Sequence, residues 1–254
     1  MSVELAHEVT GADDAPVVVL GSSLGTTRAM WDEQVSALST DYRVVRYDHR
    51  GHGGSPVPAG PYALQDLADD VLALLDRLDV EKAHLVGLSL GGMVTMQVAG
   101  TAPARVDRIA LVCTAASMPP EPWRERAAAV RDGGTASVAD AVASRWFTPQ
   151  FAATARAQAL REVLRGVPSE GYAGCCEAIA AMELLPLLPR VSAPALVVAG
   201  ALDPATPPEK ATEIVRLLGG PTRLEVLEGA AHLASVEKPE AVTRLLLDHL
   251  GGAR

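Results

Sequence analysis

The stretch Gly87-Leu88-Ser89-Leu90-Gly91 decides the expected fold of this chain. It follows an apolar run at 83–86 and precedes a run of mostly small and apolar residues at 92–99, so it predicts a strand, a sharp turn and a helix. Glycine is needed beside the serine because such a turn is strained and neighbouring backbone passes close to it. The turn would present the Ser89 hydroxyl at the edge of a sheet, where a base can activate it for attack on an acyl carbon.

A second stretch of the same pattern, Gly21-Ser22-Ser23-Leu24-Gly25, follows the apolar residues 16–20. Ser23 is therefore a rival nucleophile. We favour Ser89 because an acid and then a histidine follow it in the chain order that this kind of turn requires. The loop at Ser23 also has another use, which is described below.

Short apolar runs alternate with stretches of helical periodicity along most of the chain. Strands separated by helices predict an α/β fold, with a mostly parallel central sheet flanked by helices. The segment 118–189 has no clear buried strand, so we expect a helical cap there, over a core of residues 1–117 and 190–254. The expected strands lie at 4–9, 17–20, 42–47, 83–88, 106–113, 195–200 and 222–227, and the expected helices at 62–78, 92–99, 207–218 and 239–250.

Composition excludes several classes of partner. The net charge is −9 and no basic stripe is present, which argues against a nucleic-acid partner. No apolar run reaches membrane length, the first residues do not resemble a signal peptide, and three cysteines with one adjacent pair form no disulfide framework. These features predict a cytoplasmic protein without a membrane partner. They leave the oligomeric state open between a monomer and a small homo-oligomer.

Metal and cofactor sites are not expected. His49 and His52 belong to a glycine-rich turn at 48–55, and no third ligand follows at a metal-binding spacing. We interpret both as structural residues of the turn. No phosphate-binding glycine loop of the dinucleotide or P-loop kind is present.

A serine nucleophile needs a base, usually a histidine, and the base needs an acid that holds its tautomer. Of the six histidines, only His232 and His249 follow Ser89 far enough along the chain. His249 lies on the polar side of the last predicted helix, as a surface residue would. His232 lies in a loop directly after the last predicted strand, where ligands bind in open α/β sheets. We therefore predict that His232 is the base.

The predicted acid is Asp203, which follows the strand at 195–200. Pro204 restricts Asp203 to an extended conformation and stiffens its loop. The alternative role for Asp203 is to cap the helix that follows. Glu228 is the second candidate for the acid, because it lies close to His232 in sequence. The sequence thus predicts a catalytic triad of Ser89, Asp203 and His232.

The tetrahedral intermediate of acyl transfer needs two N–H donors for its oxyanion. One should be the backbone N–H of Leu90, directly after the nucleophile. The other should come from the loop after the early strand, where Leu24 is the expected donor. This is the second use of the Gly21–Gly25 stretch, and it makes Ser23 either a substrate contact or a turn-capping residue.

Together these motifs resemble the α/β-hydrolase superfamily over nearly the whole chain, and within it the 3-oxoadipate enol-lactonases of the β-ketoadipate pathway. The turn at Ser89 and the triad are shared across the superfamily. The narrower resemblance to the enol-lactonases comes from the sequence of the early loop and from two segments of the expected cap. The segments that carry it are 22–34, 47–55, 87–93, 145–149, 171–179, 199–208 and 232–239.

The resemblance implies hydrolysis of 3-oxoadipate enol-lactone to 3-oxoadipate in aromatic catabolism, through an acyl-enzyme on Ser89 and without a cofactor. The partner would then be a small anionic lactone. Its carboxylate calls for a bidentate cation, for which Arg145 is the candidate; the alternative is a solvated surface arginine. Trp146, beside it, would either line the pocket or anchor the cap on the sheet.

Two other classes of function stay open at this point. One is a different carboxylic-ester hydrolase or a cofactor-free perhydrolase of the same fold, which would share the triad. The other is a binding protein of the same fold without catalysis, although such proteins usually lose part of the triad. A haloalkane dehalogenase is disfavoured because those enzymes carry an aspartate at the position of Ser89.

Overall fold

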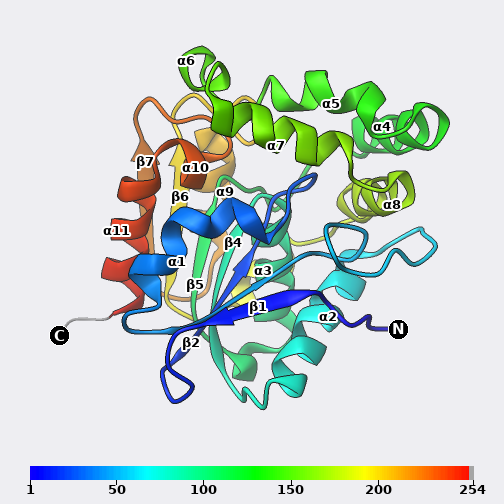
Figure 1. Cartoon of the computed structure of the whole chain (residues 1–254). Coiled ribbons are helices and arrows are strands. Elements are labelled where there is room, and N and C mark those ends of the chain that lie inside the picture. Colours follow the sequence, from blue (N-terminus) through cyan, green and yellow to red (C-terminus); the bar gives the residue numbers. More distant parts are fainter. Residues whose placement is uncertain (252–254) are drawn as a thin grey trace.

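A seven-stranded sheet in the order β1-β3-β2-β4-β5-β6-β7 forms the centre of the computed structural model, which describes residues 1–251 (Figure 1). β1 runs antiparallel to β3, and all other neighbouring strands are parallel. This confirms the predicted fold. The strands are β1 (His7–Thr10), β2 (Val17–Gly21), β3 (Arg43–Tyr47), β4 (Ala83–Leu88), β5 (Val106–Val112), β6 (Ala195–Gly200) and β7 (Thr222–Leu227).

Helices cover both faces of this sheet. α1 packs against α11 on one face, whereas α2 packs against α3 on the other. The turn Leu188–Arg190 contacts both α3 and α9. Within residues 1–251 no helix has the length and apolar character needed to cross a bilayer. The helices of the core are α1 (Asp32–Leu38), α2 (Leu64–Arg77), α3 (Leu90–Thr101), α9 (Pro208–Leu217), α10 (Ala234–Glu237) and α11 (Pro239–Leu250), and the other short 3-10 turns are Arg28–Trp31 and Pro103–Arg105.

The central strands are apolar on both faces because helices cover both faces of a parallel sheet. Every residue of β2, β4 and β6 is buried, with His84 of β4 as the one partly exposed exception. β7 lies at the edge of the sheet and is only half buried. Buried apolar runs therefore predicted the bounds of β4 and β6 correctly from sequence alone.

The first strand differs from its prediction. We expected it at 4–9, and the structure has it at His7–Thr10. β1 pairs only with β3, so few ladder hydrogen bonds define where it begins. The preceding residues are held in other ways: Leu5 is buried, and the N–H of Ala6 donates to the Ser55 hydroxyl at 2.9 Å. The short helix α1 was not predicted either, because so few residues show no clear helical periodicity.

Five helices lie between β5 and β6, inside the segment 118–189, and cover the carboxyl ends of the strands (Figure 1). They are α4 (Pro120–Gly133), α5 (Ala136–Ala143), α6 (Pro149–Ala152), α7 (Ala155–Arg165) and α8 (Ser169–Ala180).

This cap meets the core at a contact between two glycines. A Cβ atom added at Gly171 of α8 would lie 2.3 Å from the carbonyl oxygen of Gly51, which itself has φ +77°. The Sγ of Cys175, one turn further along α8, lies 3.9 Å from the Arg50 carbonyl oxygen. The backbone of α8 therefore rests directly on the turn at 48–55.

Substitution Gly171→Ala should destabilise the protein. The new methyl group has only backbone to meet, so the cap must move away from the core, and overpacking of this kind costs about 1–3 kcal/mol. Urea unfolding would measure the loss. Gly166→Ala at the end of α7 is the control, because a Cβ there lies 3.6 Å from its nearest neighbour. Equal stabilities for the two variants would contradict the close approach of the cap.

Candidate active site

Ser89 lies between β4 and α3, with backbone angles φ 55° and ψ −114°. A residue with a side chain rarely adopts this backbone conformation, and here the surrounding backbone imposes it. A Cβ at Gly87 would lie 2.1 Å from the Gly91 carbonyl oxygen, and one at Gly91 would lie 2.2 Å from that of Gly21. The Ser89 carbonyl accepts a hydrogen bond from the Thr114 hydroxyl at 2.7 Å. The turn therefore has the tight geometry that its glycines predicted.

The structure brings together the three residues predicted as the triad. His232 Nε2 lies 3.0 Å from Ser89 Oγ, and His232 Nδ1 lies 2.8 Å from Asp203 Oδ2. Both His232 and Asp203 are buried, at 5% and 3% exposure. The three residues follow β4, β6 and β7, whose carboxyl ends meet at one edge of the sheet. The arrangement is a hydrogen-bonded chain from carboxylate to imidazole to hydroxyl.

The loop after β6 holds Asp203 in its ionised form. Its Oδ1 accepts the N–H groups of Ala205 at 2.8 Å and Thr206 at 3.0 Å, and its Oδ2 accepts the Thr206 hydroxyl at 2.7 Å. Burial raises the pKa of Asp203, but His232 and the hydrogen bonds from His232 and Thr206 outweigh it, so the net pKa lies below the usual value. Asp203 thus orders its own turn as well as facing His232. Sequence reasoning missed Thr206, whose only signal was its place three residues after the aspartate.

The rival candidates do not form a comparable cluster. Ser23 faces the same cavity, but the imidazole of His232 is bonded to Ser89 instead. Glu228 is exposed, and the carboxylate that pairs with His232 is that of Asp203. The expectation that His249 is a surface residue is wrong: it is partly buried, and its Nε2 lies 2.9 Å from the Ile109 carbonyl oxygen. Its α11 helix packs on β5, which places the ring against the sheet.

Neither predicted oxyanion donor has an acceptor for its N–H within residues 1–251. Leu90 opens α3, and the first N–H groups of a helix have no intrahelical acceptor. In the early loop, Ser23 N–H donates to Met30 Sδ at 3.3 Å and Gly25 N–H to His52 Nε2 at 3.1 Å. Between them, the N–H of Leu24 has no acceptor among the residues that the structure describes. Ser89 and Leu24 line the same cavity.

The two histidines of the 48–55 turn position this early loop. His49 Nε2 lies 2.9 Å from the Ser22 carbonyl oxygen, while His52 accepts from Gly25 and its Nδ1 lies 3.2 Å from the Arg50 carbonyl oxygen. Burial lowers the pKa of His49 to about 3 and that of His52 to about 4, so both rings are neutral at pH 7. Neutral His52 can therefore donate from Nδ1 and accept at Nε2. The sequence interpretation as turn residues was incomplete, because it did not show which loop they support.

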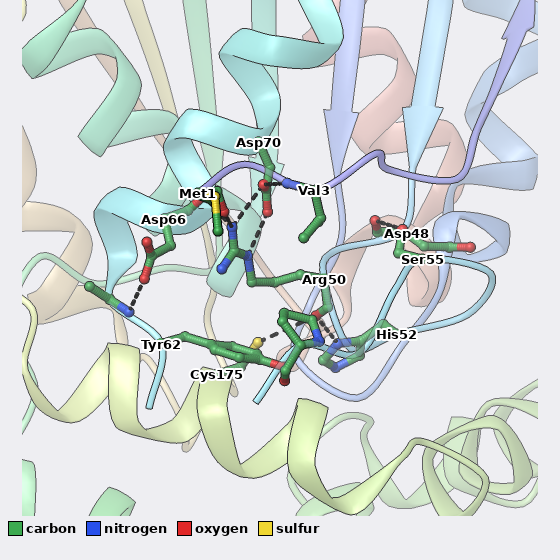
Figure 2. Close-up of polar contacts among 12 residues, drawn as sticks. Met1, Val3, Asp48, Arg50, His52, Ser55, Tyr62, Asp66, Asp70 and Cys175 are labelled. Carbon is green, nitrogen blue, oxygen red and sulfur yellow. Dashed lines mark hydrogen bonds and ion pairs between the residues drawn. The ribbon is translucent and has the colours of Figure 1, made fainter. Parts of the chain in front are cut away.

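An ion pair anchors the same turn to the core. Figure 2 shows the Arg50 guanidinium facing Asp70 of α2, with Nε at 2.6 Å and Nη2 at 2.8 Å from its two carboxylate oxygens. A hydrogen bond also closes the turn itself: the Ser55 hydroxyl donates to the Asp48 carbonyl oxygen at 2.6 Å (Figure 2). A bidentate, buried pair of this kind is directional as well as strong. It fixes the 48–55 turn, whose histidines hold the early loop that carries Leu24.

A cavity of about 250 Å³ opens above Ser89, between the strand ends and the cap. Its wall includes all three predicted substrate-binding residues. Arg145 is half-buried and not a solvated surface residue. Trp146 combines both of its expected roles, since it lines the cavity while its carbonyl oxygen accepts the Leu233 N–H at 2.9 Å. The residues that line the cavity are Ser23, Leu24, Ser89, Met118, Pro119, Pro122, Trp123, Arg126, Val142, Arg145, Trp146, Tyr172, Pro204, Ala205 and His232.

A buried carboxylate that sequence reasoning missed joins the cap to the loop of His232. Glu237 of α10 accepts the Ala231 N–H at 2.8 Å and the Thr148 N–H at 3.0 Å, and it also bonds the Thr148 hydroxyl. Thr148 belongs to the cap and Ala231 directly precedes His232. The position of the imidazole and that of the cap are therefore coupled through one side chain.

A strained serine at the end of a parallel strand, with histidine and aspartate from later strand ends, defines a hydrolase site of the α/β class. The chain belongs to the α/β-hydrolase family, and the family model described as alpha/beta hydrolase fold matches residues 16–239. It is accordingly a hydrolase, and the predicted resemblance is confirmed by the relatives below.

Several relatives are similar over nearly their whole length. 3-Oxoadipate enol-lactonase 2 of Acinetobacter baylyi is 39% identical over 242 residues, which cover 94% of this chain and 90% of the relative. The crystal structure of the enol-lactonase from Burkholderia xenovorans LB400 superposes with a TM-score of 0.94 at 39% identity, covering 98% and 97% of the two chains. RutD of Stutzerimonas stutzeri, a proposed carbamate hydrolase, is 32% identical over 248 residues, covering 93% and 92%.

The buried histidines predict a specific loss of stability in acid. A histidine with a lowered pKa in the folded protein stays neutral there, while in the unfolded chain it binds a proton below about pH 6.5. Acid therefore favours unfolding, by about 1.4 kcal/mol for each such histidine between pH 7.5 and 5.5. We expect His52→Asn to lose about 1.4 kcal/mol less than the wild type over this interval, as measured by urea unfolding at both pH values. Identical losses in the two proteins would mean that His52 is protonated in the fold.

Proposed function

We propose that this protein hydrolyses 3-oxoadipate enol-lactone to 3-oxoadipate, with Ser89 as nucleophile, His232 as general base and Asp203 as the orienting acid. The observation that carries the proposal is the unbroken chain of hydrogen bonds from Asp203 through His232 to Ser89 at the floor of a cavity with arginine in its wall. The two full-length relatives named 3-oxoadipate enol-lactonase, 39% and 37% identical, support the choice of substrate.

The first half of the reaction opens the ring. His232 Nε2 takes the proton of the Ser89 hydroxyl as its oxygen attacks the lactone carbonyl carbon. The N–H groups of Leu24 and Leu90 stabilise the oxyanion that forms. When the tetrahedral intermediate collapses, the bond between the acyl carbon and the ring oxygen breaks. The departing enolate oxygen takes the proton from His232, and the resulting enol converts to the ketone of the product.

The second half releases the acid. His232, neutral again, takes a proton from a water molecule as that water attacks the acyl-enzyme carbonyl. The second tetrahedral intermediate expels the Ser89 oxygen, which recovers its proton from His232. Asp203 stabilises the imidazolium in both halves, and the lowered pKa of its carboxyl keeps it ionised throughout. The sequence of steps uses only side chains, backbone N–H groups and water, so no cofactor is needed.

The substrate would lie between the catalytic residues and the cap. Arg145 offers its guanidinium to the substrate carboxylate, Trp146 offers an apolar wall, and Ser23 lies beside the expected position of the lactone. The product is a small dicarboxylate, as expected of an enzyme of cytoplasmic aromatic catabolism.

A carbamate hydrolase is the second candidate, and the similarity to RutD favours it. It would use the same nucleophile and base on a smaller substrate. A different ester hydrolase or perhydrolase of this fold would use the same triad. The solved bromoperoxidases that resemble this chain are only 20% and 24% identical, so they support the fold and not the activity. A binding protein without catalysis is disfavoured, because all three positions of the triad are filled and hydrogen-bonded.

Turnover of a small substrate panel tests the proposal. We expect kcat/KM to be highest for 3-oxoadipate enol-lactone, since its enolate leaves readily and its carboxylate has a cationic partner in the cavity. The comparison substrates are 4-nitrophenyl acetate, as a neutral activated ester, and carbamate. A higher kcat/KM for the neutral ester would point to a general esterase, and selective turnover of carbamate would point to the second candidate.

The assignment of the nucleophile is tested by Ser89→Ala. This variant should fold normally and lower kcat by about 10⁴- to 10⁶-fold, because the acyl-enzyme cannot form. Circular dichroism checks the fold, and a fluorophosphonate probe checks the reactive serine. The probe should label the wild type and Ser23→Ala but not Ser89→Ala. A loss of less than tenfold in kcat, or labelling that depends on Ser23, contradicts the mechanism.

A further inference from the structure

Two arginines of the cap differ from all the others. The segment 118–189 contains seven arginines. Five of them, at positions 124, 131, 156, 161 and 165, pair with a carboxylate. Arg126 and Arg145 have no ion-pair partner among residues 1–251, and both line the cavity above Ser89. The unpaired cations of the cap are thus the two that face the proposed substrate.

Arg126 is held in place despite the absence of an anionic partner. Its guanidinium lies over the ring of Trp123, 4.4 Å from the centroid, one turn earlier on α4. Stacking of this kind restricts a long side chain and keeps its N–H groups free at the edge. Trp123 itself lines the cavity. The stacking on Trp123 therefore holds the guanidinium of Arg126 at the cavity wall.

Arg145 lies close enough to Arg126 for the two charges to interact. Burial lowers the pKa of Arg145, and the positive charge of Arg126 lowers it further. Two like charges in a half-buried place repel one another, and the repulsion is relieved when an anion binds between them. The pair therefore favours an occupied cavity over an empty one, provided the occupant is negative.

Tyr172 of α8 supplies a third polar group at the same place. Its side chain is fully buried, and its hydroxyl has no hydrogen bond of normal length and angle within the described part of the chain, although the Arg126 guanidinium lies near enough to form a weak one. Burial raises the pKa of this phenol, while the charge of Arg126, its hydrogen bond and the charge of Arg145 lower it, so all three groups lie near one another. Arg126 can only donate to this hydroxyl, so the hydroxyl's own proton still lacks an acceptor, which is unfavourable in a buried place. An acceptor that entered the cavity would remove that penalty.

We propose that Arg126, Arg145 and the Tyr172 hydroxyl form one carboxylate-binding subsite in the cap, which makes the enzyme select esters that carry a free carboxylate. A carboxylate can accept from the fork of one guanidinium and still accept from a second donor and a hydroxyl. Ser89 and His232 lie at the floor of the same cavity, so an anion held in the cap directs the carbonyl of the same molecule toward the nucleophile. The inference rests on the proposed function only in assuming that Ser89 cleaves an ester bond.

Sequence reasoning missed two of the three residues. Arg126 ends the run Arg124-Glu125-Arg126, which is typical of a solvated helix face. Tyr172 lies in a helix of small residues, where an aromatic side chain is expected in the core. Only the packing of α4 against α8 brings them to one cavity. Arg145 alone was expected to bind the substrate carboxylate.

A matched pair of esters tests the subsite. Mono-4-nitrophenyl glutarate carries a free carboxylate, and 4-nitrophenyl valerate replaces it by a methyl group. We expect the wild type to favour the glutarate ester in kcat/KM. Arg126→Gln should lower kcat/KM for this ester by about 10- to 100-fold, mainly through KM, as lost charge-assisted hydrogen bonds do. Tyr172→Phe should lower it by about 3- to 10-fold. Valerate hydrolysis should change less than about threefold in each variant, since no anion is lost.

The control variant is Arg124→Gln on the same helix. Arg124 is exposed and pairs with Glu121, so its removal should leave the ratio of the two esters unchanged. Valerate hydrolysis also reports whether each variant has folded. Should Arg126→Gln fail to fold, Arg126→Lys and inhibition of the wild type replace it. The lysine variant keeps the positive charge but loses the paired N–H groups of the guanidinium. In the wild type, glutarate should inhibit valerate hydrolysis competitively, whereas glutaramide should not.

The outcomes separate the subsite from the proposed function. If the wild type opens the enol-lactone but Arg126→Gln and Arg145→Gln leave the glutarate-to-valerate ratio unchanged, the subsite is wrong and the proposed reaction stands. If the wild type ignores the enol-lactone yet favours the glutarate ester and loses this preference in Arg126→Gln, the subsite stands and the proposed substrate is wrong. Equal inhibition by glutarate and glutaramide also overturns the subsite.

Discussion

The close approach of the Gly91 backbone to Gly21 is the constraint on which the active site depends. It lets β4 turn into α3 with Ser89 at positive φ, and it brings the loop after β2 against that turn, where Gly91 N–H donates to the Ser22 carbonyl oxygen at 3.0 Å. The two N–H groups proposed for the oxyanion belong to these two segments, and the side chains of His49 and His52 hold the earlier segment in place. The histidine and the aspartate then reach the same place because the carboxyl ends of parallel strands share one edge.

Several buried polar groups around this edge are paired. Asp203 accepts from His232 and from its own loop, His52 bonds both of its ring nitrogens, and Glu237 joins the cap to the loop of the base. Buried polar groups in folded proteins are nearly always satisfied, so the exceptions call for an explanation. Of the buried side-chain atoms without a hydrogen bond of normal geometry within residues 1–251, the Tyr172 hydroxyl is the one that lines the cavity. The partly buried guanidinium groups of Arg126 and Arg145 lie in the same wall without a carboxylate partner there, and a bound anion would explain all three.

Much of this could be predicted from the sequence because it is encoded locally. Apolar runs gave the bounds of β4 and β6, and glycine spacing marked the turn at Ser89. Chain order then indicated Asp203 and His232, since each follows a strand in a parallel sheet. What failed involved contacts between distant segments: Glu237 bonds Thr148 across 89 positions, and His249 is bonded to a strand 140 positions away. No local pattern carries such information.

The sequence by itself determined the order of strands and helices, the strained serine and the three residues of the proposed triad, because each depends on neighbours within a few positions or on the topology of a parallel sheet. Only the tertiary structure decided which groups face the cavity and which are paired elsewhere. Arg124 and Arg126 are two residues apart on one helix, yet one pairs with Glu121 in solvent and the other stacks on Trp123 at the cavity wall. That difference arises from how α4 packs on α8, which is a property of the folded cap and not of either residue.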